Sequence, residues 1–105
     1  MRFQPLEKLI NLHDGYAKTF KIDSLHLLLR QDGGNLRLLE ANCPHRGHPL
    51  ASASITGGEL ECPLHAYRFS VSSGAVIHTA EEPCRGLRVF ELIYEGTEVG
   101  VMLDE

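Results

Sequence analysis

Four residues of metal-ligating type lie in two short stretches of the chain. The first stretch reads CPHRGHPL over residues 43–50, and the second reads CPLH over residues 62–65. Two thiolates and two imidazoles meet at one point if these stretches form the tips of neighbouring loops. The spacing therefore indicates a metal site whose candidate ligands are Cys43, His45, Cys62 and His65.

The order of the ligand types within each stretch bears on which metal fits. A structural zinc site commonly takes two cysteines from one turn and two histidines from a following helix. Here each stretch mixes one cysteine with one histidine, and no helical pattern follows. This order suits a [2Fe–2S] cluster in which one iron binds both thiolates and the other binds both imidazoles, because each loop then gives one ligand to each iron. A structural zinc domain is the alternative at this point.

The two stretches resemble the cluster-binding motifs of Rieske [2Fe–2S] proteins, and specifically those of the small Rieske-type ferredoxins. The resemblance extends to Phe69 and Gly74, which stand where such ferredoxins tend to carry an aromatic residue and a turn glycine. It implies one [2Fe–2S] cluster per chain and a Rieske-like antiparallel β sandwich or barrel. It also implies a two-loop cluster-binding subdomain over approximately residues 42–78.

The resemblance assigns a role to each candidate ligand. Cys43 and Cys62 would bind the buried iron, whereas His45 and His65 would bind the outer iron at the solvent edge. A protonatable imidazole beside an iron links the redox state to pH. The resemblance implies that Pro44, Gly47, Pro63 and Leu64 shape the loops so that backbone N–H groups point at the sulfur atoms.

The chain departs from the pattern of high-potential Rieske proteins. Those proteins carry a further cysteine in each loop, where this chain has His48 and Leu64. They also carry a serine and a tyrosine that hydrogen-bond to sulfur, where this chain has Tyr67 and Phe69. Without those hydroxyls the extra negative charge of the reduced cluster is less stabilised. We therefore expect a midpoint potential near the low end of the Rieske range, about −150 mV.

The rest of the chain is expected to form short strands that hold the two loops. Residues 26–30 are apolar on both faces, which predicts a strand covered on each side, and residues 32–35 form a turn signal. Residues 6–12 fit either a short strand followed by an irregular turn or a single helical turn. Further strands are expected over residues 16–22, 36–40, 59–61, 67–71, 75–78, 89–94 and 99–103. Strands at this spacing, without a convincing long helix, indicate an all-β sandwich or barrel.

Length and charge limit the classes of function. A chain of 105 residues fits a single domain over residues 1–105. Ten Lys and Arg residues against fourteen Asp and Glu residues give a net charge of −4, which argues against a nucleic-acid binder because phosphate contacts need clustered cations. An acidic surface is better suited to docking a basic protein partner.

Cysteine use and hydropathy indicate a cytoplasmic protein. Residues 1–8 lack the apolar segment of a signal peptide, and the longest apolar run, residues 27–29, is far too short to span a membrane. Three cysteines, two of them at ligand spacing, argue against a disulfide framework. Cys84 has no nearby histidine or second cysteine in the sequence, so we expect it to pack as a small hydrophobic residue.

No catalytic apparatus accompanies the candidate metal site. The sequence shows neither a second metal triad for oxygen activation nor a glycine-rich nucleotide motif. The resemblance therefore implies a soluble one-electron carrier that passes electrons from a flavoprotein reductase to a terminal oxygenase. The alternative is an accessory subunit similar to the Rieske-like small subunit of nitrite reductase.

Overall fold

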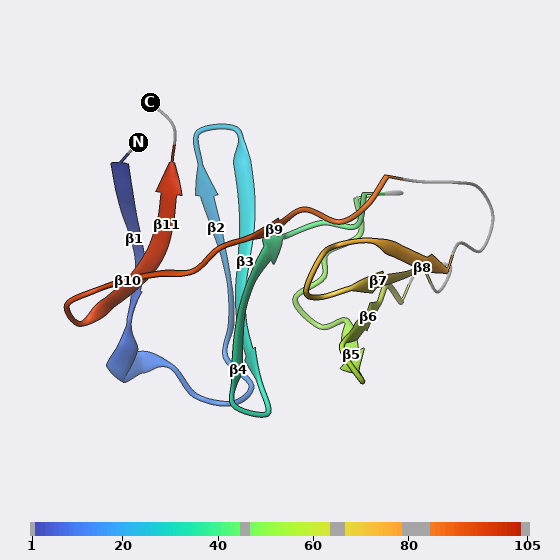
Figure 1. Cartoon of the computed structure of the whole chain (residues 1–105), viewed down its shortest axis with the longest axis horizontal. Helices are drawn as coiled ribbons and strands as arrows, with labels where there is room; N and C mark the ends of the chain where they lie inside the picture. Colours follow the sequence, from blue (N-terminus) through green and yellow to red (C-terminus); the bar gives the residue numbers. More distant parts are fainter. Residues whose placement is uncertain (1, 45–46, 64–66, 79–84, 104–105) are drawn as a thin grey trace.

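The computed structural model describes residues 2–44, 47–63, 67–78 and 85–103, and within these ranges the strands form three antiparallel sheets (Figure 1). In spatial order, the first sheet contains β1 (Arg2–Lys8), β11 (Glu98–Leu103) and β10 (Ile93–Glu95). The second sheet contains β2 (Ala17–Ile22), β3 (Leu25–Asp32), β4 (Asn35–Glu40) and β9 (Val89–Phe90). The third sheet contains β5 (Ser54–Thr56), β6 (Glu59–Glu61), β7 (Arg68–Ser70) and β8 (Val76–His78). A 3-10 turn, η1 (Leu9–Asn11), follows β1.

The second sheet lies between the other two, and its strands β3 and β4 carry buried residues on both faces. Successive side chains of a strand point to opposite faces, so Leu27 and Leu29 of β3 point one way and Leu28 points the other. All three are fully buried, which confirms that this strand is covered on each side. Leu27 and Leu29 belong to one buried cluster and Leu28 to another. The molecule is therefore layered, with a sheet on either side of β3 and β4.

The first buried cluster, called here the sandwich core, joins the first and second sheets. The second sheet contributes Leu27, Leu29 and Leu38, and the first sheet contributes alternate residues of β11, namely Val99, Val101 and Leu103. One face of β11 is therefore buried, as its alternating pattern predicts. These two sheets form the expected antiparallel β sandwich.

The second buried cluster, called here the loop core, joins the second and third sheets. It contains Leu28 and Leu39 from the second sheet together with Leu60 and Phe69 from the third. Cys43 and Cys62 belong to the same cluster. The loop core therefore places both candidate thiolate ligands on the face of β3 and β4 that lies opposite the sandwich core.

Two expectations from the sequence need correction. Residues 6–12 do contain the end of a strand followed by a turn, as one of the two readings expects. However, β1 begins at Arg2, four residues before that segment. A bulge between Pro5 and Glu7 interrupts its pairing with β11, which hides the alternation that marks a strand.

The second correction concerns residues 89–94, which do not form one strand. Val89 and Phe90 pair with β4 in the second sheet, whereas Ile93 and Tyr94 pair with β11 in the first. The chain changes sheets between these pairs, so Phe90 packs on the sandwich core but Tyr94 is 57% exposed.

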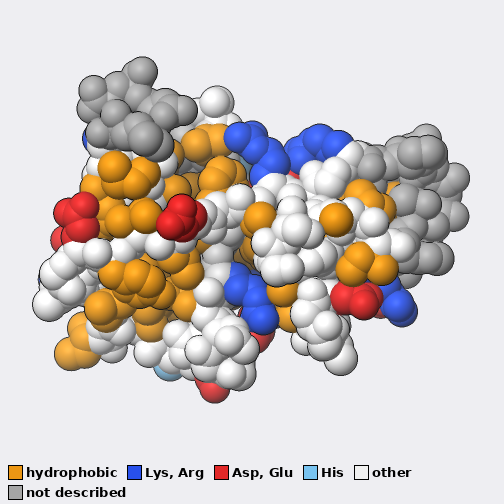
Figure 2. Space-filling view, in the orientation of Figure 1, with side chains coloured by type: hydrophobic (Ala, Val, Ile, Leu, Met, Phe, Trp, Pro, Cys, Tyr) orange, Lys and Arg blue, Asp and Glu red, His pale blue; other side chains and the backbone are white. Residues whose placement is uncertain are grey.

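Figure 2 shows hydrophobic side chains gathered over the left-hand part of the visible face, where the first and second sheets lie.

Two leucine substitutions on β3 should separate the roles of the cores. Leu28→Ala and Leu27→Ala should each lower the free energy of unfolding by about 2–5 kcal/mol, because each removes a fully buried side chain. Only Leu28→Ala should speed amide exchange in the cysteine-bearing loops, since only Leu28 packs in the loop core. Urea unfolding and hydrogen exchange measure the two effects. Equal loop exchange in the two variants would contradict the division into separate cores.

Candidate metal centre

The first loop runs from Ala41 to Leu50 and is closed by backbone hydrogen bonds. Leu50 N–H donates to Ala41 O at 2.9 Å, and Cys43 N–H donates to His48 O at 2.8 Å. Gly47 N–H returns to Cys43 O at 2.7 Å, with Gly47 in the left-handed region at φ +73°. A side chain is disfavoured in that conformation, which explains a glycine at this turn. The loop thus presents Cys43 at a defined position near its base.

The second loop connects β6 to β7. Cys62 follows β6 directly, and its N–H donates to Tyr67 O at 2.8 Å across the base of the loop. The amides of Cys43, Gly47 and Cys62 thus close the loops, and the expectation that loop N–H groups point at sulfur stays a prediction for the other loop amides. Leu64 lies outside the described residues.

Cys43 and Cys62 are both buried, at 3% and 1% exposure, and both lie in the loop core. A buried cysteine in apolar surroundings is a poor free nucleophile, because its thiolate lacks solvation. A pair of such thiols at the bases of two loops is instead suited to binding a buried metal ion as thiolates. The structure therefore fits the thiolate half of a [2Fe–2S] ligand set.

The other two candidate ligands, His45 and His65, lie outside the described residues, as does Cys84. Within the described ranges, no group of three or more metal-ligating side chains comes together. His48, which the sequence places in the first loop, is half-buried beside the exposed Pro49. His13 and His26 are exposed.

Tyr67 and Phe69 fill the loop core beneath the loops. Both side chains are fully buried and share one cluster with the two cysteines. Phe69 offers no hydrogen-bond donor there. The apolar surroundings keep water from the sulfur atoms, which is one of the factors that set the potential of an iron–sulfur cluster.

Arg30 is a supporting residue that sequence reasoning missed. It lies on β3 at 7% exposure, on the face that carries Leu28. Its Nη1 donates to the backbone oxygens of Leu50 and Ala53 at 3.1 and 2.7 Å. A charged side chain on the covered face of a strand needs buried hydrogen-bond partners. This requirement is the sequence signal that points to Arg30 as a supporting residue. The partners themselves lie 20 and 23 residues further along the chain, which no local pattern reveals.

A second arginine ties the start of the first loop to the chain that returns from the third sheet. Arg85 Nη1 and Nη2 donate to the two carboxylate oxygens of Glu40 at 2.7 and 2.8 Å, and Arg88 N–H donates to the same carboxylate at 2.8 Å. Glu40 ends β4 just before the first loop. Two hydrogen bonds between one guanidinium and one carboxylate strengthen the ion pair and also fix the orientation of the two groups.

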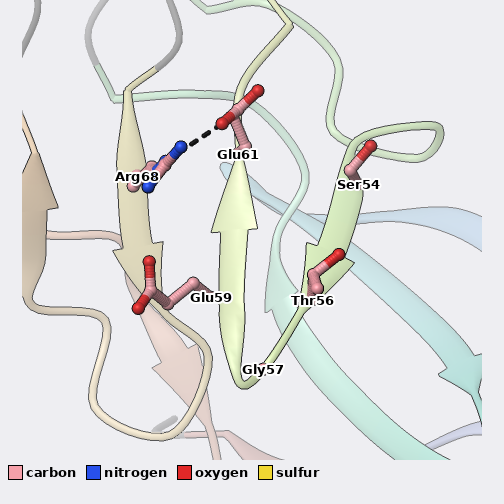
Figure 3. A pocket seen from close by; sticks show the side chains of 6 residues that line it. All are labelled: Ser54, Thr56, Gly57, Glu59, Glu61 and Arg68. Atoms are coloured by element: carbon pink, nitrogen blue, oxygen red, sulfur yellow. Dashed lines mark hydrogen bonds and ion pairs between the residues drawn. The ribbon is translucent and has the colours of Figure 1, made fainter.

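A cavity of about 360 Å³ lies on the outer face of β5, β6 and β7 and is lined by Ser54, Thr56, Gly57, Glu59, Glu61 and Arg68 (Figure 3). Arg68 Nε and Glu61 Oε1 are 3.0 Å apart there, with both side chains about half exposed. An exposed pair of this kind contributes little to stability. The cavity is an open polar surface beside the second loop.

A family model described as the Rieske [2Fe-2S] domain matches residues 3–91. The chain belongs to this family. Rieske membership favours the [2Fe–2S] reading of the ligand stretches over structural zinc. It also agrees with the observed layered antiparallel fold.

Relatives of this Rieske chain include ferredoxin components. The chain is 32% identical over 90 residues to the ferredoxin component of the alkene monooxygenase system of Xanthobacter autotrophicus, with 85% of this chain and 71% of the relative covered. It is 31% identical over 64 residues, or 61% of its length, to mouse apoptosis-inducing factor 3, but that match spans only 11% of the relative's length.

Solved structures with a similar fold include a ferredoxin and a reductase small subunit. The ferredoxin of carbazole 1,9a-dioxygenase from Nocardioides aromaticivorans aligns with a TM-score of 0.76 and 27% identity, over 96% of this chain and 97% of that one. A protein described as the small subunit of an NADPH nitrite reductase aligns with a TM-score of 0.74 over 98% and 100% of the two chains. At 16% identity, this second likeness shows the fold alone.

The ion pair of Arg30 with Asp32 should make stability depend on pH. Hydrogen bonds from Arg30 hold the pKa of the Asp32 carboxyl below its ordinary value. Because the folded-state pKa is lowered, the pair stabilises the fold above the unfolded pKa of about 3.9, and the contribution is lost as pH falls through the folded value. Asp32→Asn should cost about 1–3 kcal/mol near pH 7, and this cost should shrink in acid.

Asp23→Asn is the matched control for that measurement. Its carboxylate is 85% exposed and lies 3.9 Å from Arg2, so the substitution should change the free energy of unfolding by less than about 0.5 kcal/mol. Urea titrations at several pH values compare the variants. A cost of Asp32→Asn that does not vary with pH would contradict the role of the ion pair.

Proposed function

We propose that this protein is a one-electron carrier built around a Rieske [2Fe–2S] cluster. The observation on which the proposal chiefly depends is the pair of buried cysteines, Cys43 and Cys62, in two loops of a chain that belongs to the Rieske family. When bound, the cluster supplies reversible transfer of a single electron. We further propose that residues 1–105 form one Rieske domain, with the cluster-binding subdomain over approximately residues 42–78.

The proposed ligand set follows the order of residue types in each loop. Cys43 and Cys62 hold the inner iron within the apolar loop core, and His45 and His65 hold the outer iron. The backbone hydrogen bonds at the bases of the loops keep the two cysteines in place. Tyr67 and Phe69 help to exclude water from the sulfur atoms, because both are fully buried in one cluster with the two cysteines.

The proposed partners are redox proteins. Ferredoxin components of an alkene monooxygenase system and of a carbazole dioxygenase are similar to this chain over most of its length. We infer that it receives electrons from a flavoprotein reductase and passes them to a terminal oxygenase by transient docking. The half-buried His48 and the exposed Pro49 belong to the proposed contact patch with His45, Leu64 and His65.

An accessory subunit of a nitrite reductase-type enzyme is the second candidate, because the small subunit described above shares the fold. Elution of the native protein as a stable complex with a large enzyme subunit would favour that role over the free carrier. We propose the cytoplasm as its compartment. In the described part of the chain, no helix has the length and apolar character needed to cross a membrane.

A ligand variant and a loop control test the proposed cluster. Anaerobically purified wild-type protein should be red-brown and should give the low-average-g EPR signal of a Rieske cluster when reduced. His65→Cys should abolish that signal, because it replaces an imidazole by a thiolate on the outer iron. His48→Gln should retain the signal, since His48 lies in the first loop but is not a proposed ligand. An unaltered signal in His65→Cys would refute the ligand set, and a colourless zinc-containing protein would refute the cluster.

The midpoint potential should lie near the low end of the Rieske range. Phe69 is fully buried in the loop core and supplies no hydroxyl to stabilise the reduced state. A redox titration of the purified protein should therefore give about −150 mV. A midpoint well above zero would show that other donors stabilise the reduced cluster.

A further inference from the structure

The guanidinium of Arg30 joins the sandwich part of the molecule to the chain that leaves the first loop. Arg30 belongs to β3, and its Nη1 donates to the carbonyl oxygens of Leu50 and Ala53 at 3.1 and 2.7 Å. Leu50 is the last residue of the first loop and is fully buried. One cation on the second sheet therefore satisfies one carbonyl group at the end of the loop and one just after it.

Asp32 orients this guanidinium. Its two carboxylate oxygens accept hydrogen bonds from Nε and Nη2 of Arg30, each at 2.8 Å. A guanidinium is planar, so fixing Nε and Nη2 also fixes the directions in which Nη1 can donate. The carboxylate thus aims Nη1 at the two carbonyls, which a lysine at this position could not reproduce.

The position of Leu50 is transmitted to Cys43 through the base of the loop. Leu50 N–H donates to Ala41 O at 2.9 Å, so Leu50 is held by Arg30 at its carbonyl and by Ala41 at its amide. A β-bridge between Asn42 and Pro49 comes next, followed by the hydrogen bond from Cys43 N–H to His48 O at 2.8 Å. These contacts form a continuous ladder from the Arg30 guanidinium to the backbone of Cys43.

We propose that Arg30 is a positioning residue for the metal centre, which sets the place of the first loop, and with it Cys43, relative to β3. The part of this inference that concerns the cluster rests on the proposed function. The part that concerns the loop depends only on the described contacts. Arg30 acts on the centre through the backbone of the loop, with Asp32 as its orienting partner.

Arg37 provides a matched control. It lies directly opposite Arg30 on β4 and therefore on the same face of the sheet. Its Nη1 is buried and has no hydrogen-bond partner in the described part of the chain. Arg37→Gln thus removes a positive charge from the same face without removing a hydrogen bond of this buried nitrogen to the first loop.

Amide hydrogen exchange on the whole chain tests the loop part of the proposal. Arg30→Gln should speed exchange of the Cys43 and Leu50 amides by about tenfold or more, because the buried charged donor that holds the loop is lost. The Val99 amide in the sandwich core should change by less than about twofold. Arg37→Gln should leave all three amides within about twofold of wild type. Equal exchange at Cys43 and Leu50 in the two variants would overturn the proposal.

The EPR spectrum tests the part that concerns the metal centre. Arg30→Gln should change the g values of the reduced protein, whereas Arg37→Gln, which removes the same charge, should leave them unchanged. Unchanged g values in Arg30→Gln, or an equal change in both variants, would overturn a positioning role. If the wild-type protein has no Rieske signal, the proposed function fails, and the exchange rates still decide whether Arg30 places the loop.

A measurement on the wild-type protein covers the case in which Arg30→Gln does not fold. Nitrogen-15 NMR of the arginine side chains should show hindered rotation of the Arg30 Nη groups, because Nη1 and Nη2 are both hydrogen-bonded. The exposed Arg88 should show averaged Nη signals. Averaged signals for Arg30 as well would overturn the proposal without any variant.

Discussion

Burial of both faces of β3 and β4 is the constraint on which the rest of the structure depends. An antiparallel sheet often leaves one face to solvent, but here Leu27 and Leu29 face the sandwich core while Leu28 faces the loop core. A slip of one residue in β3 would exchange these sets and would place Arg30 in the sandwich core. The two cores therefore fix the register of the strand together.

The proposed metal centre is supported by this central sheet. The loop core contains the two cysteines and packs directly on Leu28 and Leu39. Polar contacts then join the same sheet to the loops, through Arg30 at the end of the first loop and through Glu40 at its start. Apolar packing holds the loops against the sheet, and directional hydrogen bonds define where along the sheet they sit.

Much of this arrangement can be predicted from the sequence, because its signals are local. Three consecutive leucines predict a strand covered on both faces, and the alternation of Val99, Val101 and Leu103 predicts one buried face of β11. The order of cysteine and histidine in each stretch indicates the type of centre without any structure.

What could not be predicted depends on distant partners or on irregular backbone. The bulge after Pro5 obscures β1, and the change of sheet between Phe90 and Ile93 makes two strands of one alternating segment. The contacts of Arg30 join positions 20 or more residues apart, which no pattern of neighbouring residues encodes. Such contacts become visible only when the second and third sheets are placed together.

The pairing of β1 with β11 also has a practical consequence for fusing or tethering this domain. Arg2 lies opposite Leu103 in that pairing, so both ends of the described chain emerge side by side from the first sheet. The third sheet, which carries the loop core on its inner face, lies at the opposite end of the long axis of the molecule. A fused domain, an affinity handle or an electrode tether attached at either end would therefore leave the loop end free to meet a redox partner.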